Sequence, residues 1–237
     1  MSWTMAQAAA RIAQDLPEGS VVNLGIGLPT LIADHLPSGR EILLHSENGI
    51  LGLGPGVPEP EADWDIIDAG KRPVSLVLGA AIFHHADSFA MIRGGHIDVA
   101  VLGAYQVSRA GDLANWSVDD GPTLPGVGGA MDLAAGARQV YVLSRHTRAD
   151  GSPKLVGECT LPLTATGVVT RFYSDLAVIE FAEPGPSVIE LAPGVPFEDV
   201  QKLSGTALSL SAATARGEST GRTSAAAMQR TRCFRLG

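Results

Sequence analysis

Leu44-His45-Ser46-Glu47-Asn48-Gly49-Ile50-Leu51-Gly52-Leu53-Gly54-Pro55 is the stretch that decides the architecture of this chain. The apolar run that leads into it, Ile42-Leu43-Leu44, predicts a short buried strand. Asn48-Gly49 predicts a tight turn, because both residues tolerate a positive φ. Glu47 is thus placed at the carboxyl end of a strand, where open α/β sheets bind their ligands. A poorly solvated carboxylate there is suited to act as a nucleophile, and the alternative is a surface turn with an incidental glutamate.

Strand and helix patterns alternate along the rest of the chain. A helix capped by Thr4 is expected to end near Asp15. Apolar runs predict strands at 21–24, 41–44, 74–78, 97–102, 139–143, 168–170 and 176–181, and helical spacing predicts helices at 30–35, 86–92 and 197–203. Residues 52–65, rich in glycine, proline and acids, predict a loop. This alternation predicts an α/β fold, with a mostly parallel open sheet and helices on both faces.

Composition and charge exclude several classes of protein. The net charge of −8 argues against a nucleic-acid partner. No apolar run reaches the roughly 18 residues that a membrane span needs. The N-terminus lacks the basic and apolar segments of a secretory signal, so we expect a cytoplasmic protein with no membrane partner. Cys159 and Cys233 are too few and too far apart for a disulfide framework or a metal cluster.

The segment 209–237 differs in composition from the rest of the chain. It is rich in Ser, Ala, Thr, Gly and Arg and has few large apolar residues. Such a segment buries too little surface to offset the entropy of ordering. We therefore predict one domain over 1–208 and a polar, basic tail over 209–237. Disorder and a chain end read in a shifted frame both fit this composition.

Several motifs together resemble family I CoA-transferases, and within them the B subunits of 3-oxoacid and 3-oxoadipate CoA-transferases. The resemblance extends over roughly residues 5–205. It is carried by Ser-Glu-Asn-Gly followed by Leu-Gly-Leu-Gly-Pro, and by the segments 23–31, Ala69-Gly70-Lys71, Ser88-Phe89-Ala90-Met91-Ile92-Arg93-Gly94-Gly95 and Pro125-Gly126-Val127-Gly128-Gly129-Ala130-Met131-Asp132-Leu133. It implies a fold like that of CoA-transferases and sugar-phosphate isomerases.

The resemblance also implies catalytic roles for two residues. Glu47 is expected to be the covalent nucleophile. The backbone N–H of Gly129 is expected to help form an oxyanion hole, and glycine suits that role because it exposes its amide without a side chain in the way. The alternative for Gly129 is a tight turn that enters a helix at Met131, which is compatible with the same role.

Four residues are expected to bind CoA. By the resemblance, Lys71 contacts the anionic part of CoA, and a lysine beside a flexible glycine is a suitable point charge for phosphate. Asn48, next to Glu47, and the glycines of the turn Gly25-Ile26-Gly27 are expected to face the acyl or CoA end. The alternatives are a solvated surface lysine and glycines that only permit close packing of a helix on a strand.

His84, His85 and Arg93 are the candidate substrate-binding residues. The preceding His-His-Ala-Asp resembles the 3-oxoadipate-specific enzymes, and a dicarboxylate would benefit from such donors. The alternative is a histidine pair that caps or braces the helix. No third ligand follows at useful spacing, so no metal site is expected.

The resemblance implies that CoA passes from succinyl-CoA to a 3-oxoacid through a glutamyl-CoA thioester. 3-Oxoadipate is the expected acceptor. The CoA thioester is a substrate, and no cofactor is expected. A separate A subunit is the expected partner, in an A2B2 heterotetramer. Acetoacetate is the alternative acceptor. A more distant alternative is an effector-binding domain of related fold without chemistry, since fold alone does not define function.

Overall fold

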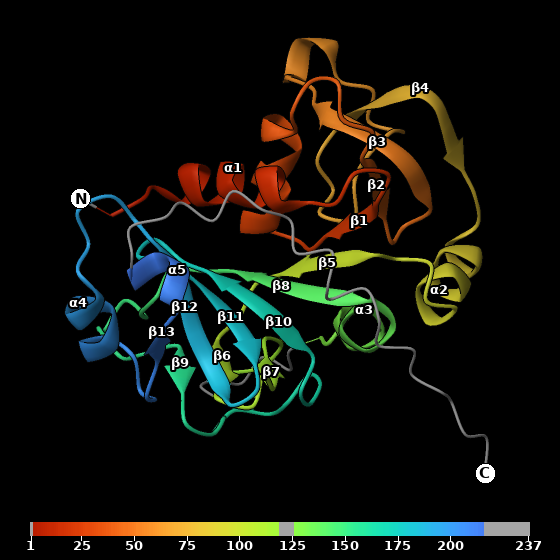
Figure 1. Ribbon diagram of the computed structural model, residues 1–237. Coiled ribbons are helices and arrows are strands. Elements are labelled where there is room, and N and C mark those ends of the chain that lie inside the picture. The colour runs from red at the N-terminus through yellow and green to blue at the C-terminus, as the bar shows by residue number, and fades with distance from the viewer. Residues whose placement is uncertain (1, 119–125, 216–237) are drawn as a thin grey trace.

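Ten strands form one sheet through most of the chain (Figure 1). The computed structural model describes residues 2–118 and 126–215. The strands lie in the order β13-β12-β11-β10-β8-β5-β1-β2-β3-β4. Their bounds are β1 Val21–Leu24, β2 Leu43–Ser46, β3 Ile50–Gly56, β4 Val74–Ile82, β5 Val99–Leu102, β8 Gln139–Leu143, β10 Val169–Tyr173, β11 Ala177–Ala182, β12 Gly185–Leu191 and β13 Ser209–Leu210.

The centre of the sheet is parallel, as predicted. Strands β2, β1, β5, β8 and β10 pair in parallel, so their carboxyl ends meet at one edge. Antiparallel strands flank them on both sides: β3 and β4 beyond β2, and β11 and β12 beyond β10. Ser46 ends β2, which places Glu47 at the ligand-binding edge of the parallel core.

Helices cover both faces of the sheet, which confirms the predicted fold class. One face packs against α1 (Met5–Asp15) and the 3₁₀ helix η1 (Leu28–His35). The other face packs against α2 (His85–Arg93), α3 (Ala130–Gly136) and α4 (Phe197–Lys202). A small sheet of β6 (Gln106–Ser108), β7 (Leu113–Ala114) and β9 (Leu155–Val156) lies on this second side.

The start of α1 follows directly from the sequence. Thr4 accepts a hydrogen bond from the N–H of Gln7, and the Gln7 side chain accepts one from the N–H of Thr4. This reciprocal pair is a capping box, and it satisfies two donors that would otherwise lack partners. Ala8, Ala9 and Ile12 are fully buried on one side of the helix.

The prediction of a loop over residues 52–65 is wrong for residues 52–56. Residues Ile50–Gly56 form β3, which pairs antiparallel with β2 and β4. Glycine and proline are normally depleted in strands. Gly52 is nevertheless required here, since its φ is +89° and a β-carbon on it would lie 2.9 Å from Ala80 Cα. Close backbone approach thus explains a glycine-rich strand. Farther along this segment, Glu59–Glu61 forms the short 3₁₀ helix η2.

Order continues past the predicted domain boundary at residue 208. Ser209 and Leu210 form β13 against β12, and Ala212–Ala215 form the short helix α5. Leu208 and Leu210 pack against the buried cluster on the second face of the sheet. These two leucines hold the start of the segment on the domain, although its overall composition is polar. The rest of the predicted tail, 216–237, lies outside the described residues.

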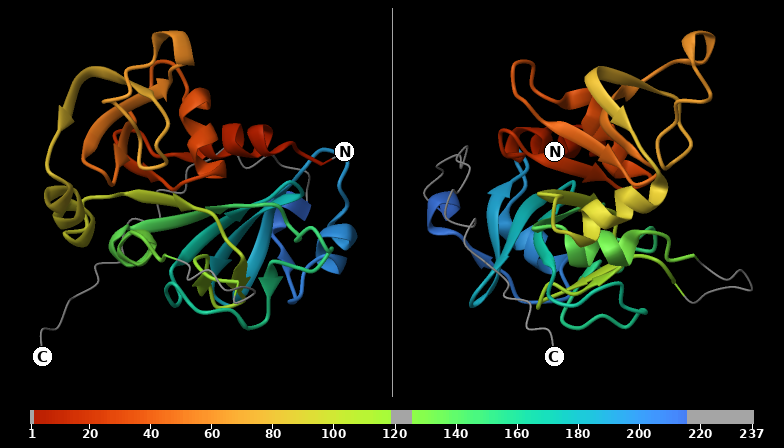
Figure 2. Two further views of the ribbon diagram at one scale, coloured as in Figure 1. Left: turned by 180° about the vertical axis from the view of Figure 1, so that it is seen from behind. Right: turned by 90° about the vertical axis from the view of Figure 1, so that its right-hand side faces the viewer.

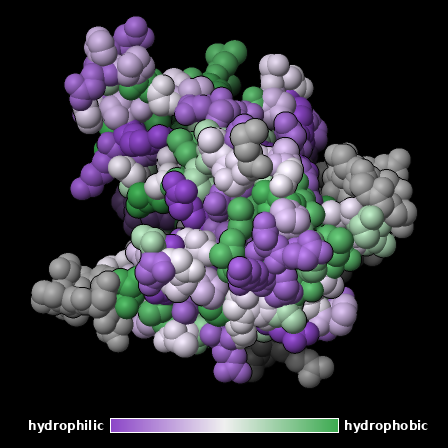
Figure 3. Space-filling model, turned by 90° about the vertical axis from the view of Figure 1, so that its left-hand side faces the viewer, coloured by the Kyte–Doolittle hydropathy of each residue, from purple (hydrophilic) through white to green (hydrophobic). Residues whose placement is uncertain are grey.

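Among residues 2–118 and 126–215, no helix is both long and apolar enough to cross a membrane. On the side that carries the N-terminus and α4, hydrophilic and hydrophobic residues are interspersed (Figure 3).

Candidate active site

The Glu47 turn connects β2 to β3 and is held in place by Gly49. Gly49 has a φ of +114°, and a β-carbon on it would lie 2.2 Å from the carbonyl oxygen of Phe83. Only glycine fits both requirements. The N–H of Phe83 donates to Gly49 O at 2.9 Å, so the turn is joined to the segment that enters α2. This contact brings the two predicted histidines to the same edge of the sheet as Glu47.

Gly129 lies against the Glu47 carboxylate. A β-carbon on Gly129 would lie 2.5 Å from Glu47 Oε2 and 2.9 Å from Phe89 Cζ. Gly129 is also the N-cap of α3, so the helix begins beside the carboxylate. Helices α2 and α3 lie side by side (Figure 2). The absence of a side chain at Gly129 therefore lets the carboxylate of the turn after β2 meet the backbone at the start of α3.

Glu47 is half-buried, and its electrostatic surroundings are mixed. Burial raises the pKa of the carboxyl, because a charged group loses hydration there. The charge of His85 opposes that rise, whereas the nearby Asp132 carboxylate adds to the raised pKa. A carboxylate with weakened solvation and a raised pKa is a better nucleophile than one fully hydrated at the surface.

Two of the predicted CoA-binding residues, Asn48 and Lys71, lie on neighbouring turns that are hydrogen-bonded to each other. Asn48 Nδ2 donates to Ile67 O at 2.7 Å, and Ser46 Oγ accepts from Ala69 N at 2.9 Å. These bonds hold the turn of residues 68–71 against the Glu47 turn. Lys71 is exposed at the end of that turn with a φ of 64°, the sole positive φ of a non-glycine residue in the described chain. Such strain often accompanies function.

Gly25 and Gly27, in the turn after β1, must be glycine for different reasons. A β-carbon on Gly25 would lie 3.0 Å from Val101 O, so Gly25 permits close packing of β1 on β5. Gly27 has open space around it and a φ of +92°, so its backbone conformation requires glycine. Gly27 also begins η1. Of the two, Gly27 is better placed to expose its backbone to a ligand.

The predicted substrate-binding residues do not form one cluster. His84 caps α2, with its Nδ1 accepting from Ala86 N at 3.1 Å, as the structural alternative foresaw. His85 faces the charge of Glu47, and its ring packs on Phe89 with centroids 4.7 Å apart. Arg93 ends α2, about 12 Å along the helix axis from His85. It pairs with both carboxylate oxygens of Asp132, at 2.7 and 3.2 Å.

Sequence reasoning missed a buried polar group directly beneath the site. His45 is 2% exposed, and its Nδ1 lies 3.0 Å from Asn23 Nδ2. Because an amide NH₂ only donates, Nδ1 is the acceptor and the proton sits on Nε2, which lies 2.9 Å from Ser88 Oγ. The three side chains join β1, β2 and α2. A sequence signal was available, since His45 is a polar residue that directly follows the apolar run Ile42-Leu43-Leu44, two residues before Glu47.

A second missed residue is Asp132, in the first turn of α3. Asp132 accepts a hydrogen bond from Arg93 on α2, and its negative charge adds to the raised pKa of Glu47. No pattern in the sequence indicates this, because the link depends on how α2 packs on α3.

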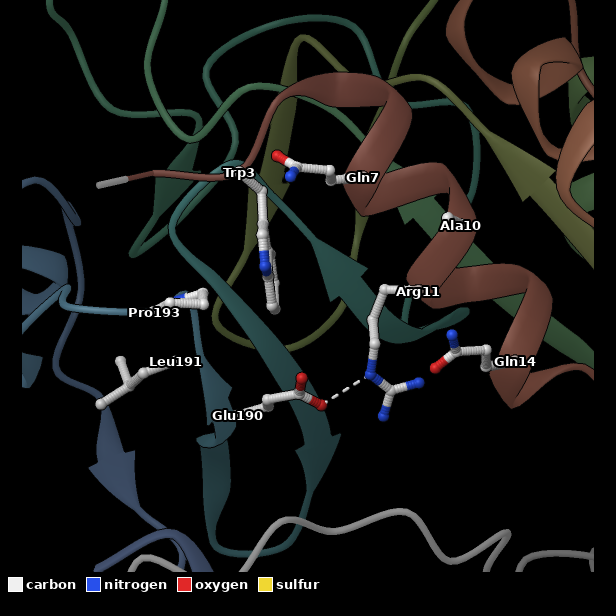
Figure 4. A pocket seen from close by; sticks show the side chains of 8 residues that line it. All are labelled: Trp3, Gln7, Ala10, Arg11, Gln14, Glu190, Leu191 and Pro193. Carbon is white, nitrogen blue, oxygen red and sulfur yellow. Dashed lines mark hydrogen bonds and ion pairs between the residues drawn. The ribbon is translucent and has the colours of Figure 1, made fainter.

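A cavity of about 280 Å³ lies elsewhere, between α1 and β12 (Figure 4). Trp3, Arg11 and Glu190 line it, and Arg11 Nε pairs with Glu190 at 2.7 Å. The charged groups in this cavity are thus paired with each other. None of the predicted site residues lines it.

Stability is expected to fall between pH 7 and pH 5 because of two buried histidines. Burial lowers the pKa of His45 and of His146 to about 4, against 6.5 for an exposed imidazole. The unfolded chain therefore takes up protons that the folded chain refuses, so stability is fully present above pH 6.5 and is lost as the pH falls toward 4. The loss between pH 7 and pH 5 is about 2 kcal/mol for each histidine. The raised pKa of Glu47 acts in the opposite direction.

Urea unfolding at several pH values measures this effect. His45→Gln and His146→Gln retain a polar side chain but do not titrate, so each should flatten the pH dependence by about half. An unchanged slope in both variants would show that other groups control it.

Comparisons with known proteins show the family to which the chain belongs. Residues 5–203 match the Coenzyme A transferase family. The chain is 54% identical over 202 residues to the B subunit of the 3-oxoadipate CoA-transferase of Pseudomonas putida, covering 85% of this chain and 94% of that one. It is 50% identical over 192 residues to the B subunit of the succinyl-CoA:3-ketoacid coenzyme A transferase of Helicobacter pylori, covering 81% and 92%.

A solved structure shows the same fold. An acyl-CoA transferase (YdiF) of Escherichia coli O157:H7 superposes with a TM-score of 0.68 at 21% identity, covering 88% of this chain. This chain spans only 42% of the length of that protein.

The chain belongs to the Coenzyme A transferase family. Two relatives that this chain covers almost completely, at 94% and 92% of their lengths, carry the names of B subunits.

Proposed function

We propose that this chain is the B subunit of a CoA-transferase that moves CoA from succinyl-CoA to a 3-oxoacid, with 3-oxoadipate as the preferred acceptor. The observation that supports it best is the placement of Glu47 Oε2 against the backbone of Gly129 at the carboxyl edge of the parallel strands. A nucleophile beside a bare backbone segment is what acyl transfer requires.

In the proposed first half-reaction, a Glu47 oxygen attacks the thioester carbonyl of succinyl-CoA. A carbon–oxygen bond forms, the carbon–sulfur bond breaks, and CoA leaves as a thiolate. The thiolate then attacks the Glu47 carbonyl carbon of the mixed anhydride, giving a glutamyl-CoA thioester and free succinate. The Gly129 N–H would stabilise the oxyanion that develops at each addition.

The second half-reaction reverses these steps with a different acid. The carboxylate of the 3-oxoacid attacks the glutamyl thioester and displaces the CoA thiolate. The thiolate then attacks the acyl carbon of the new anhydride, which releases the acyl-CoA product and restores Glu47. Protons and electrons balance without a metal or redox cofactor. Binding of the CoA moiety by Lys71 and its neighbours would stabilise these transition states.

Mass spectrometry of the intact protein tests the proposal. The chain with its companion A subunit, mixed with succinyl-CoA and no acceptor, is expected to gain the mass of CoA minus water on a peptide that contains Glu47. Adding 3-oxoadipate should remove the adduct. An adduct on another residue, or none with turnover present, would refute the assigned nucleophile.

Steady-state kinetics with different acyl acceptors identify the preferred substrate. The names of the relatives favour two candidate acceptors. One relative is named for 3-oxoadipate and another for a 3-ketoacid. The proposal predicts a higher kcat/KM for 3-oxoadipate than for acetoacetate. A preference for acetoacetate would keep the reaction class and replace the substrate.

Replacing His84 and His85 together with serine should weaken use of 3-oxoadipate more than use of acetoacetate. The second carboxylate of 3-oxoadipate needs a donor or a cation, and acetoacetate has none. Loss of a charge-assisted hydrogen bond typically costs about 1.5–3 kcal/mol, so a drop in kcat/KM of about tenfold or more is expected for the dicarboxylate.

The matched control is His84→Ser alone. Serine is a good N-cap, so this variant keeps the cap of α2 and should retain most selectivity. The loss is then expected to come from His85, which is the histidine that faces Glu47. Equal losses for both acceptors in the double variant would remove the histidines from the account of specificity.

A further inference from the structure

Three positively charged residues lie close together beyond the end of β8. Arg145 and Arg148 follow β8, and Lys154 directly precedes β9. We call these three residues the basic cluster. None of them forms a salt bridge within the part of the chain that the structure describes. Their positive charges therefore repel one another without a bound carboxylate to offset the repulsion.

A short hairpin of the backbone brings the basic cluster together. Thr147 and Pro153 pair as an antiparallel bridge, and the N–H of Lys154 donates to His146 O at 3.2 Å. Lys154 therefore lies across the hairpin from His146, which is the neighbour of Arg145 in the sequence. The spacing of the cluster is thus set by hydrogen-bonded backbone as well as by flexible side chains.

The ammonium group of Lys154 is held at the carboxyl ends of two parallel strands. Its Nζ donates to Ala104 O at 3.1 Å, just beyond β5, and to Ser144 Oγ at 2.6 Å, just beyond β8. An ammonium has three N–H donors, so a third remains for a ligand. Burial lowers the pKa of Lys154, and the charges of Arg148 and Arg145 lower it further, so the three cations interact.

Arg148 carries a buried donor that has no acceptor. Its Nη2 is buried without a hydrogen-bond partner, which is true of no other side-chain nitrogen or oxygen within residues 2–118 and 126–215. The great majority of buried polar groups in folded proteins are hydrogen-bonded. A cationic donor that departs from this rule is suited to bind an anion.

Two carboxylates lie near the basic cluster, and both already accept hydrogen bonds. Asp175, near Lys154, accepts at Oδ1 from the N–H of His146 at 2.8 Å. Asp150 follows Arg148 in the hairpin turn and accepts at Oδ1 from Ser152 N and Oγ, at 2.9 and 2.6 Å. Three cations and two carboxylates leave one positive charge in excess. The ring of His146 adds none at neutral pH, because burial lowers its pKa to about 4.

The basic cluster lies beside the point where the strand order of the sheet reverses. From β1, the chain places β2 on one side and β5, β8 and β10 on the other. In open α/β sheets, the crevice outside the strand ends at such a point binds ligands. Gly103, between β5 and Ala104, has open space where a β-carbon would be. Because β8 lies three strands from β2, roughly 14 Å at ~4.8 Å per strand, this place is separate from Glu47.

We propose that the basic cluster binds a tetrahedral oxyanion of the phosphate class, held by Arg148 Nη2, the third N–H of Lys154 and the exposed guanidinium of Arg145. Arginine matches two phosphate oxygens at once, and lysine supplies a point charge. Inorganic phosphate and a phosphate group of CoA are the two sources of this chemistry. The site is separate from Glu47, so its test does not depend on the proposed reaction.

The thermal midpoint of the full-length chain tests the proposal, measured in sodium phosphate and in sodium chloride of equal ionic strength. A ligand that binds the folded state raises the midpoint, and a titration gives its Kd. Arg148→Gln should raise the Kd for inorganic phosphate by about tenfold or more, because a charge-assisted hydrogen bond is lost. The variant should fold, since Arg148 Nη2 has no partner to lose.

The matched control is Arg138→Gln, which makes the same charge change just before the start of β8. Arg138 is exposed there and pairs with Asp98 at 2.9 Å. This variant should bind phosphate as the wild type does. A wild-type midpoint that phosphate does not raise, or wild-type phosphate affinity in Arg148→Gln, would overturn the site. An equal loss in both variants would also overturn it, because a general effect of net charge would then explain the binding.

Hydrogen exchange on the wild-type chain gives a measurement that needs no variant. The amides of residues 145–154 should become protected when inorganic phosphate is saturating, and unchanged exchange there would contradict the proposed site.

Adenosine 3′,5′-bisphosphate distinguishes the two sources of the anion. If it binds at least as tightly as inorganic phosphate and needs Arg148, the site takes the nucleotide end of CoA. If inorganic phosphate binds and the bisphosphate does not, the site takes the free anion. If neither binds, the proposal is wrong.

Discussion

Glu47→Ala, assembled with the A subunit, is expected to lose CoA transfer by about 10⁴-fold or more, because removal of a covalent nucleophile removes the whole two-step route. The side chain is half-buried and makes no hydrogen bond that another element depends on in the described chain. The fold and the contact with the A subunit should therefore survive. Initial rates of acyl-CoA formation from succinyl-CoA and 3-oxoadipate measure the loss.

Two further variants at the same position separate chemistry from packing. Glu47→Gln keeps the shape but is a poor nucleophile, so it should be about as inactive as alanine. Glu47→Asp keeps the carboxylate and withdraws it by one methylene, and it should also fail because attack depends on geometry at the scale of an ångström. Near-normal turnover in Glu47→Ala, with the thermal midpoint unchanged, would end the nucleophile assignment.

The parallel core of the fold was predictable because its signals are local. Strands β1, β5 and β8 are short apolar runs, and the cap of α1 is written in Thr4 and Gln7. Strand β3 was not predictable in this way. Its glycines and its proline are typical of loops, and only the close approach of β4, at Ala80 and at Ser75, explains why Gly52 and Gly54 stand in a strand.

In the candidate site, too, some residues were predictable from local sequence motifs and others depend on how the elements pack. Glu47 and Gly129 were predicted from motifs, and the fold brings together the turn after β2 and the start of α3 that carry them. The surroundings that tune Glu47 depend on packing between α2 and α3, which no periodicity reports. Arg93 illustrates the difference: predicted as a donor to substrate, it is bound to Asp132 at 2.7 Å. A role for Arg93 toward substrate would require that pair to open.

Gly129→Ala is expected to reduce kcat by about 100-fold or more while leaving the protein folded. The added methyl carbon would lie 2.5 Å from Glu47 Oε2 and 2.9 Å from Phe89 Cζ, both far inside van der Waals contact. The carboxylate is the more mobile neighbour, so it should move away by about 1 Å, and a shift of that size at a reacting atom costs about 10²-fold. The same methyl would crowd the space in front of the Gly129 amide, whose loss as an oxyanion donor costs a further ~10²–10³-fold.

The matched control is Gly126→Ala, three residues earlier in the same segment. A β-carbon there meets no heavy atom within 4 Å, and its φ lies outside the left-handed range, so this substitution should be nearly neutral. The decisive measurement is the single-turnover rate at which the glutamyl-CoA adduct forms, because it isolates attack by Glu47 from acceptor binding and product release. If Gly129→Ala forms the adduct as fast as Gly126→Ala, the backbone at Gly129 contributes nothing to the reaction, and its closeness to Glu47 reflects packing alone.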